Sequence, residues 1–218
     1  MDPDFWHERW QTRQIGFHQS RPHPMLERWW PAIDALPGSR VYVPLCGKTL
    51  DMVWLAVRGH RVVGTELSAV AVQEFFGEQA AAPGVTQHGP FRRHASGPFE
   101  ILEGDAFLAT AELLGPVRAA YDRAALVAMP PELRPLYVES FASLLPPGSK
   151  ALLIAFEYPQ ALKAGPPFAV LREEVEWLYG PHFEVQELER IDIIGESPKF
   201  AEAGVEALFE VAYRLERR

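Results

Sequence analysis

The sequence RVYVPLCGKTLDMVWLAVRGHRVVGTELS, residues 40–68, decides the fold of this chain. Its first five residues, 40–44, form a short apolar β-type run that leads into a loop. Residues 51–58 follow with apolar side chains at helical spacing, and residues 61–65 form a second β-type run. The stretch therefore predicts a strand, a helix and a second strand in immediate succession.

A second helix is predicted directly after this stretch. Ser68 is a plausible N-cap, because its hydroxyl can accept a backbone N–H of the first turn, and residues 69–79 continue the helical pattern. Two consecutive strand–helix units are the signature of a parallel, doubly wound sheet.

Further β-type runs complete the expected sheet. They occupy residues 99–103, 119–123, 150–156, 183–191 and 208–215. The run KALLIAF (150–156) is almost entirely apolar, as a strand buried on both faces should be. The last two runs alternate and are expected to form an antiparallel pair at the sheet edge. We predict an α/β fold with seven mostly parallel strands and helices on both faces.

The segments between these runs are expected to be helices and loops. Helices are predicted over residues 131–145, opened by Pro131, and over residues 170–179. Residues 81–98 are rich in Gly, Pro and polar side chains, and we expect a surface loop there.

The first thirty-five residues differ from the rest of the chain. They are aromatic and polar and are expected to form short helices broken at Gly16 and near Pro22. Trp6 and Trp10 are four residues apart and would share one helix face. Spacing alone favours ordinary core packing; the alternative is a segment that closes over a cofactor, where aromatic faces suit a sulfonium cation.

Length and composition set limits on the class of protein. The chain has 218 residues, 48% of them hydrophobic, and a net charge of −8, and we expect one domain over residues 1–218. No stretch gathers basic residues, so neither nucleic acid nor an anionic membrane is an expected partner. One cysteine, no apolar N-terminal segment and no bilayer-length apolar window indicate a cytoplasmic protein.

Candidate ligand-binding residues follow the ends of the predicted strands, where open α/β sheets bind ligands. After the first strand come Leu45, Cys46 and Gly47, and after the second comes Glu66, nineteen residues beyond Gly47. That spacing is typical of an acid that binds ribose hydroxyls. Asp105 follows the third strand.

The fourth strand ends in Asp122-Arg123. Each of these signals is weak alone, because the glycine can be structural, the Glu66 carboxylate solvated and Asp122-Arg123 a surface ion pair. Three acids at successive strand ends together favour ligand binding. Cys46 is interpreted as a packing residue rather than a nucleophile, since no partner His is indicated.

The seven histidines show no convincing metal-binding spacing, and no metal is expected. His18 and His23 flank Pro22 and are interpreted as surface or substrate-lid residues.

Several of these segments resemble bacterial thiopurine S-methyltransferases along nearly the whole chain. The strings that carry the resemblance are WHERWQTRQIGFHQ (6–19), VPLCGK (43–48), GHRVVGTELS (59–68), YDRAALVAM (121–129) and GPPF (165–168). Their order and spacing also agree. The resemblance implies a Rossmann-like methyltransferase fold, S-adenosylmethionine as cofactor, S-adenosylhomocysteine as product and a monomer.

The resemblance also implies roles for individual residues. Residues 1–35 would be a helical segment that covers the cofactor. Phe17 matches an aromatic residue that packs on a flat heterocyclic substrate, and Arg123 would contact both cofactor and anionic substrate. The expected cofactor-binding residues are Trp6, Trp10, Leu45, Gly47, Glu66, Asp105, Ala106 and Arg123.

One position departs from the family pattern. Family members carry a second arginine near the substrate late in the chain, whereas ESPKF (196–200) offers Lys199 as the nearest cation. Lysine is a point charge and lacks the fork of donors of arginine. The resemblance implies small aromatic or heterocyclic thiols, or selenium and tellurium anions, as substrates, and the sequence does not choose among them.

Three rival functions fit parts of the same pattern. A methyltransferase acting on oxygen or nitrogen usually needs a base or a metal, and neither is evident. A sensor that binds S-adenosylmethionine without turnover is the second rival, and the presence of Glu66, Arg123 and both N-terminal tryptophans argues against it. A nicotinamide dehydrogenase is the third, and PLCGK lacks the glycine-rich fingerprint of that class.

Overall fold

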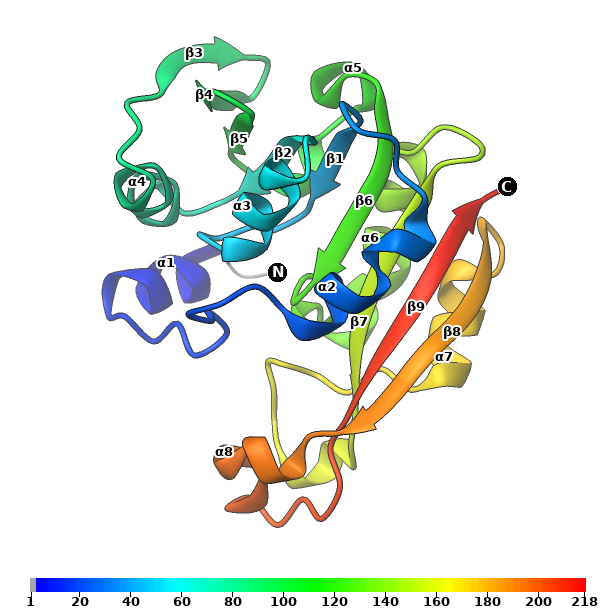
Figure 1. Ribbon diagram of the computed structural model, residues 1–218. Helices are drawn as coiled ribbons and strands as arrows, with labels where there is room; N and C mark the ends of the chain where they lie inside the picture. The colour runs from blue at the N-terminus through cyan, green and yellow to red at the C-terminus, as the bar shows by residue number, and fades with distance from the viewer. Residues whose placement is uncertain (1–2) are drawn as a thin grey trace.

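The computed structural model describes residues 3–218, which form a twisted sheet with helices on both faces (Figure 1). The strands are β1 (Arg40–Val43), β2 (Arg61–Glu66), β3 (Gly84–His88), β4 (Phe91–Ser96), β5 (Phe99–Glu103), β6 (Val117–Arg123), β7 (Lys150–Glu157), β8 (Phe183–Asp192) and β9 (Phe209–Arg217). They follow the order β3-β4-β5-β2-β1-β6-β7-β9-β8 in one sheet.

The seven predicted strands are confirmed and lie next to one another in this order. β1 is the topological switch point, because it pairs in parallel with β2 on one side and with β6 on the other. β9 runs antiparallel to both β7 and β8, as expected for the terminal pair. The α/β fold class predicted from the sequence is therefore confirmed.

The expected loop over residues 81–98 is wrong, because this segment contains β3 and β4. Two tight turns at Gly89-Pro90 and Gly97-Pro98 join β3 to β4 and β4 to β5, and both glycines have positive φ. Nearly all of β3 is exposed, so its side chains show no burial pattern and its pairing rests on backbone hydrogen bonds. The two Gly-Pro pairs are the sequence signal that could have revealed this hairpin.

The helices cover both faces of the sheet. They are α1 (Pro3–Gln11), α2 (Pro24–Trp29), α3 (Leu50–Val57), α4 (Ala69–Glu78), α5 (Ala111–Leu114), α6 (Arg134–Ser143), α7 (Arg172–Tyr179) and α8 (Pro198–Ala201). Short 3-10 turns lie at Trp30–Ile33, Ala106–Leu108, Leu126–Ala128, Pro131–Leu133, Gln160–Leu162 and Ile194–Glu196. No helix among residues 3–218 is both long and apolar enough to cross a membrane.

Two apolar cores lie on opposite sides of the sheet. Leu152 and Ile154 of β7 pack into the core under α2 and α3, and Ala151 and Leu153 pack into the core under α6 and α7. β7 therefore contributes to both cores, as its nearly continuous apolar sequence predicts.

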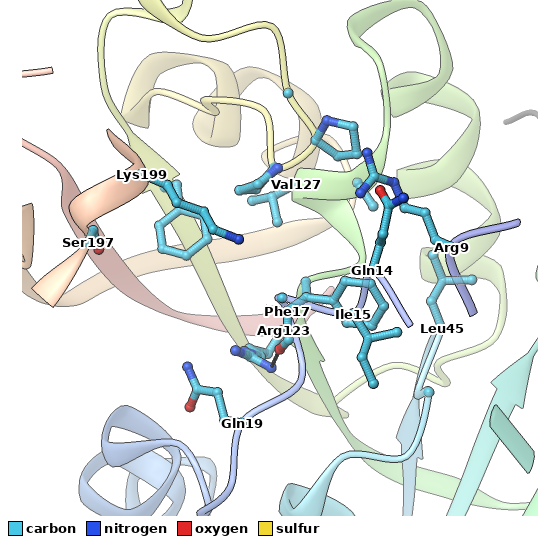
Figure 2. Close-up of a pocket in the computed structure, with 18 of the residues that line it drawn as sticks. Arg9, Gln14, Ile15, Phe17, Gln19, Leu45, Arg123, Val127, Ser197 and Lys199 are labelled. Atoms are coloured by element: carbon cyan, nitrogen blue, oxygen red, sulfur yellow. Dashed lines mark hydrogen bonds between the residues drawn. The ribbon is translucent and has the colours of Figure 1, made fainter. Parts of the chain in front are cut away.

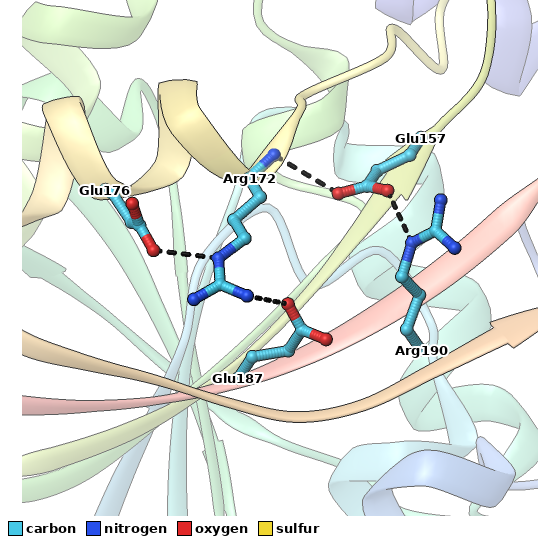
Figure 3. A network of polar contacts seen from close by, with 5 residues as sticks. All are labelled: Glu157, Arg172, Glu176, Glu187 and Arg190. Atoms are coloured by element: carbon cyan, nitrogen blue, oxygen red, sulfur yellow. Dashed lines mark hydrogen bonds and ion pairs between the residues drawn. The ribbon is translucent and has the colours of Figure 1, made fainter.

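A polar network outside the cores attaches α7 to the sheet (Figure 3). Glu157 accepts hydrogen bonds from the backbone N–H of Arg172 (3.2 Å) and from Nε of Arg190 (2.8 Å). Arg172 also pairs with Glu176 (2.8 Å) and Glu187 (3.3 Å). These contacts place the start of α7 against β7 and β8.

Candidate functional site

A cavity of about 1070 Å³ lies at the carboxyl ends of the parallel strands, where an open α/β sheet binds ligands. The N-terminal segment crosses it, and the strand-end loops, the GPPF loop and α8 complete its wall. Eight of the ten residues predicted for the site line this cavity: Trp6, Trp10, Phe17, Leu45, Gly47, Glu66, Arg123 and Lys199.

Asp105 and Ala106 lie beside the cavity rather than in its lining. Asp105 is exposed and caps the turn that follows β5, where its carboxylate accepts the backbone N–H of Phe107 at 3.0 Å. The preceding Gly104 donates its N–H to the carbonyl of Glu66 at 2.9 Å. This turn therefore adjoins the end of β2, and a contact between Asp105 or Ala106 and the cofactor stays a prediction.

The loop after β1 brings its backbone close to the cavity. Leu45 and Gly47 both have positive φ, 45° and 50°, a conformation that favours glycine. A Cβ atom on Gly47 would lie 3.0 Å from Cζ2 of Trp10. Glycine at position 47 thus lets the indole ring of Trp10 pack directly on the loop backbone.

Glu66 is a buried carboxylate in the cavity wall. Its Oε2 accepts the N–H of Gly47 at 2.8 Å and its Oε1 accepts the N–H of Ser68 at 2.7 Å. Burial raises the pKa of Glu66 to about 7, although these backbone hydrogen bonds oppose the shift. Each oxygen keeps a second acceptor position, so the group can still accept two hydroxyls of a ligand.

Three aromatic rings of the N-terminal segment gather over the cavity. The ring of Phe17 lies edge-on to Trp6 at 5.9 Å and to Trp10 at 5.6 Å between centroids. Trp10 is only 3% exposed, so it is a core residue as well as a cavity-lining one. The Nε1 of Trp6 is buried and has no hydrogen-bond partner among residues 3–218.

Arg123 connects the end of β6 to this N-terminal segment. Its Nη1 donates to the carbonyl of Phe17 at 2.9 Å (Figure 2). The rest of the guanidinium lies along the cavity and keeps further donors available for a ligand. Four residues before Phe17, Arg13 forms an ion pair with Glu74 of α4 at 3.3 Å.

Asp122 and Cys46 lie next to site residues in the sequence, but both are buried and have structural roles. Asp122 is fully buried and accepts the hydroxyl of Tyr137 at 2.7 Å and the N–H of Leu126 at 3.2 Å. Burial raises the pKa of Asp122 to about 6. The thiol of Cys46 is buried against Gly64, where a Cβ would lie only 2.5 Å from Sγ. The predicted packing role of Cys46 agrees with this contact.

The other half of the cavity is formed by the GPPF loop and α8. Gly165, Pro166 and Pro167 line it. Figure 2 shows Lys199 reaching from α8 toward the space that Arg123 also borders. The two cations therefore lie on the same cavity, which the sequence alone could not establish.

The expected position of His23 is wrong, because its side chain is 2% exposed and caps α2 from the interior. Its Nε2 lies 3.1 Å from Oε1 of Glu210, a residue of β9 that lines the cavity. Sequence reasoning missed Glu210 altogether, because a glutamate within an alternating strand carries no local signal of function. Only its place in the cavity wall makes it a candidate site residue.

The chemistry of the wall fits S-adenosylmethionine. Glu66 offers acceptors suited to ribose hydroxyls, Leu45 and Gly47 line the cavity beside it, and Trp6 offers a buried donor without a partner among residues 3–218. Within the part of the chain that the structure describes, no cluster of three His, Cys, Asp or Glu side chains is placed to hold a metal ion.

The sheet order and this strand-end cavity define a class, the Rossmann-like fold of S-adenosylmethionine-dependent methyltransferases. A methyltransferase of that kind from Anabaena variabilis superposes with a TM-score of 0.65 at 15% identity, covering 99% of this chain and 95% of its own. The likeness confirms the fold.

Sequence comparison narrows the class to one family. The model of the thiopurine S-methyltransferase family matches residues 1–218. Thiopurine S-methyltransferases of Xanthomonas campestris pv. campestris and Pseudomonas entomophila are 49% and 48% identical over 217 residues, covering 100% of each chain. The chain belongs to the thiopurine S-methyltransferase family, and the resemblance noted in its sequence is confirmed.

Proposed function

We propose that this chain transfers the methyl group of S-adenosylmethionine to the sulfur of small heterocyclic thiols, thiopurines among them. The observation that carries the proposal is the cavity that Glu66, Arg123 and Phe17 share. These residues come from three distant segments and supply an acceptor for ribose, a cation for an anionic nucleophile and a flat apolar ring.

The cofactor would occupy the part of the cavity over β1 and β2. Glu66 would accept the ribose hydroxyls, and the backbone at Leu45 and Gly47 would pass close beside it. Trp6 and Trp10 would cover this part, where their faces suit a sulfonium. The bound cofactor supplies a methyl group already activated by a positively charged sulfur.

The thiol that accepts the methyl group would occupy the part of the cavity over β6 and β7. Phe17 would pack on the heterocycle, and Arg123 would stabilise the thiolate form by its positive charge. Lys199 is proposed as a second cation at this end. An acidic heterocyclic thiol is substantially ionised near neutral pH, so orientation is the main contribution of these residues to an in-line displacement. We assign no general base, and Asp122 is held by Tyr137.

Substitution of Arg123 tests this role. We expect Arg123→Ala to lower kcat/KM for 6-mercaptopurine by about 10- to 100-fold, the usual effect of losing a hydrogen bond to a charged group. Arg118→Ala, in the same strand but outside the cavity lining, should leave it unchanged. Undiminished turnover by Arg123→Ala would contradict the assignment.

A panel of acceptors tests the reaction class. Methyl transfer from labelled S-adenosylmethionine is measured with 6-mercaptopurine, thiophenol, selenite and a catechol. Methylation of the thiols or of selenium, with the catechol untouched, would support a soft anionic nucleophile. Cofactor binding without any product would favour the sensor, and activity on the catechol alone would overturn the proposed mechanism.

The remaining proposals concern the molecule in the cell. We propose a single catalytic unit over residues 1–218, with residues 1–35 as its cofactor-covering segment, that acts in the cytoplasm as a monomer without metal. Its net charge of −8 supports the absence of nucleic-acid and anionic-membrane partners. Selenium and tellurium anions share the soft nucleophilic chemistry of thiolates and are proposed as additional substrates.

A further inference from the structure

Glu210 places a buried carboxylate in the wall of the cavity, opposite in charge to Arg123. The residue is 9% exposed and lines the cavity. One carboxylate oxygen, Oε1, lies 3.1 Å from Nε2 of His23. The other oxygen, Oε2, has no hydrogen-bond partner among residues 3–218. Only one of the two carboxylate oxygens of Glu210 is therefore hydrogen-bonded within the protein, and the other can accept a hydrogen bond from a ligand.

His23 determines how this carboxylate is held. Its Nδ1 accepts the backbone N–H of Met25 at 3.3 Å, so that nitrogen carries no proton. Nε2 must then carry the proton and donate it to Oε1 of Glu210. The backbone N–H of His23 donates to Asp51 at 2.7 Å, and Asp51 also accepts the hydroxyl of Tyr121 at 3.1 Å. The imidazole is thus positioned by the cap of α2 and by α3.

The register of the sheet relates Glu210 to Arg123. Arg123 pairs with Ile154 across β6 and β7, and Ile154 pairs with Ala212 across β7 and β9. Residues paired across neighbouring strands share a face, and so do residues two apart in one strand. Glu210 therefore stands on the same face as Arg123, with the Cα atoms roughly 12 Å apart by strand geometry.

We infer that Glu210 is a specificity-determining residue that accepts a hydrogen bond from a ring N–H of the heterocyclic thiol. Such a substrate has an electron-rich sulfur at one side and an N–H donor at another. Arg123 would contact the sulfur and Glu210 would accept the N–H. The pair would therefore select substrates that carry both groups. Thiolates without a ring N–H give this oxygen of Glu210 no hydrogen bond, which a polar site penalises.

The inference rests on the thiopurine reaction proposed above, and two substrates test it separately. 6-Mercaptopurine keeps an imidazole N–H as its thiolate, whereas 9-methyl-6-mercaptopurine has none. We expect the unaltered enzyme to favour 6-mercaptopurine in kcat/KM by about tenfold or more. Methylation of either substrate establishes the reaction itself; equal efficiency on the two would overturn the role of Glu210 while leaving the reaction intact.

Glu210→Gln sharpens the test, because His23 donates to the group. The amide oxygen of Gln would face Nε2–H of His23, and the amide NH₂ would then face the cavity and turn an acceptor into a donor. We expect kcat/KM for 6-mercaptopurine to fall by about 10- to 100-fold and that for the 9-methyl compound to change by less than about threefold, which erases the preference.

Control measurements separate this effect from damage to the fold. Glu206→Gln removes the same charge from an exposed residue outside the cavity lining and should behave as the unaltered enzyme. The affinity of Glu210→Gln for S-adenosylmethionine should also be unchanged. A parallel loss on both substrates, or no loss on either, would overturn the inference.

Discussion

Glu66 shows how one residue acquires its binding chemistry from its surroundings. The side chain ends β2, is buried, and accepts backbone N–H groups from both the loop at Gly47 and the start of α4. Burial outweighs these hydrogen bonds and raises the pKa of Glu66 to about 7. A glutamate with this pKa changes its charge near physiological pH, so the cofactor binding proposed for Glu66 would depend on pH.

We predict that the affinity for S-adenosylmethionine rises with pH through this pKa. Hydroxyl donors of the ribose favour the charged carboxylate, so binding is strongest above pH 7 and weakens as the pH falls below it. The dissociation constant should decrease by about tenfold between pH 6 and pH 8, as measured by calorimetry. Glu66→Gln should bind about tenfold more weakly at pH 8 and lose this part of the pH dependence.

Glu112→Gln serves as the control, because Glu112 is exposed and lies outside the cavity lining. It should retain the pH dependence of the unaltered chain. An identical pH dependence in Glu66→Gln would assign the titration to a different group.

The N-terminal element differs from the rest of the fold in how it is held. α1 contacts α4, and residues 13–19 cross the cavity without joining the sheet. It is attached to the rest of the chain by the hydrogen bond from Arg123 to the carbonyl of Phe17, by the Arg13–Glu74 ion pair and by the packing of Trp10 on Gly47. Such a segment opens more easily than a strand, and ligands on its inner side stabilise it.

We therefore expect cofactor binding to slow amide hydrogen exchange in this element. Saturation with S-adenosylhomocysteine should slow exchange over residues 9–19 by about tenfold or more. The hairpin over residues 84–96, which contributes nothing to the cavity lining, should exchange at an unchanged rate. Equal protection of both segments would indicate general stabilisation, and no protection of residues 9–19 would contradict the covering role.

On the scale of the whole molecule, buried acids make stability depend on pH. Burial raises the pKa of Glu66 to about 7 and that of Asp122 to about 6. The folded state therefore binds protons on these groups where the unfolded chain has released them. These two raised pKa values make the free energy of unfolding fall as the pH rises from about 4 to about 7. Above about pH 7 they cause no further change.

Two other acids act in the opposite direction. The Lys48 ammonium lowers the pKa of Glu74, and Arg93 and Arg40 lower that of Glu100 against the opposing effect of burial. Their stabilisation is present above the ordinary glutamate pKa and is lost as the pH falls below it. Glu66 and Asp122 therefore act against Glu74 and Glu100 in the dependence of stability on pH.

We predict that Asp122→Asn makes the pH dependence shallower. The free energy of unfolding, measured by urea denaturation, should fall on the order of 2–3 kcal/mol less between pH 4 and pH 7 than in the unaltered chain. The absolute stability of Asp122→Asn is not informative, because the amide also alters the hydrogen bond with Tyr137. The test is the slope of the free energy of unfolding against pH. Glu202→Gln, an exposed position, should keep the original slope.

Local sequence patterns were sufficient for most of the sheet. The seven predicted strands appear within about two residues of their expected limits because each carries its own hydrophobic run between turn residues. β3 escaped prediction because its side chains are nearly all exposed and only its backbone pairing defines it. The predicted helix over residues 131–145 is shorter, with a 3-10 turn before α6.

The sequence by itself determined the fold class, the family and most of the residues at the strand ends, because strand-forming runs, turns and motif spacing act between near neighbours in the chain. Only the tertiary structure decided which of these residues share a cavity. It buried Glu66 and so raised its pKa, joined Arg123 to Phe17, and set His23 against Glu210, 187 residues away. Contacts of this kind depend on the packing of whole elements around the sheet, which no local pattern specifies.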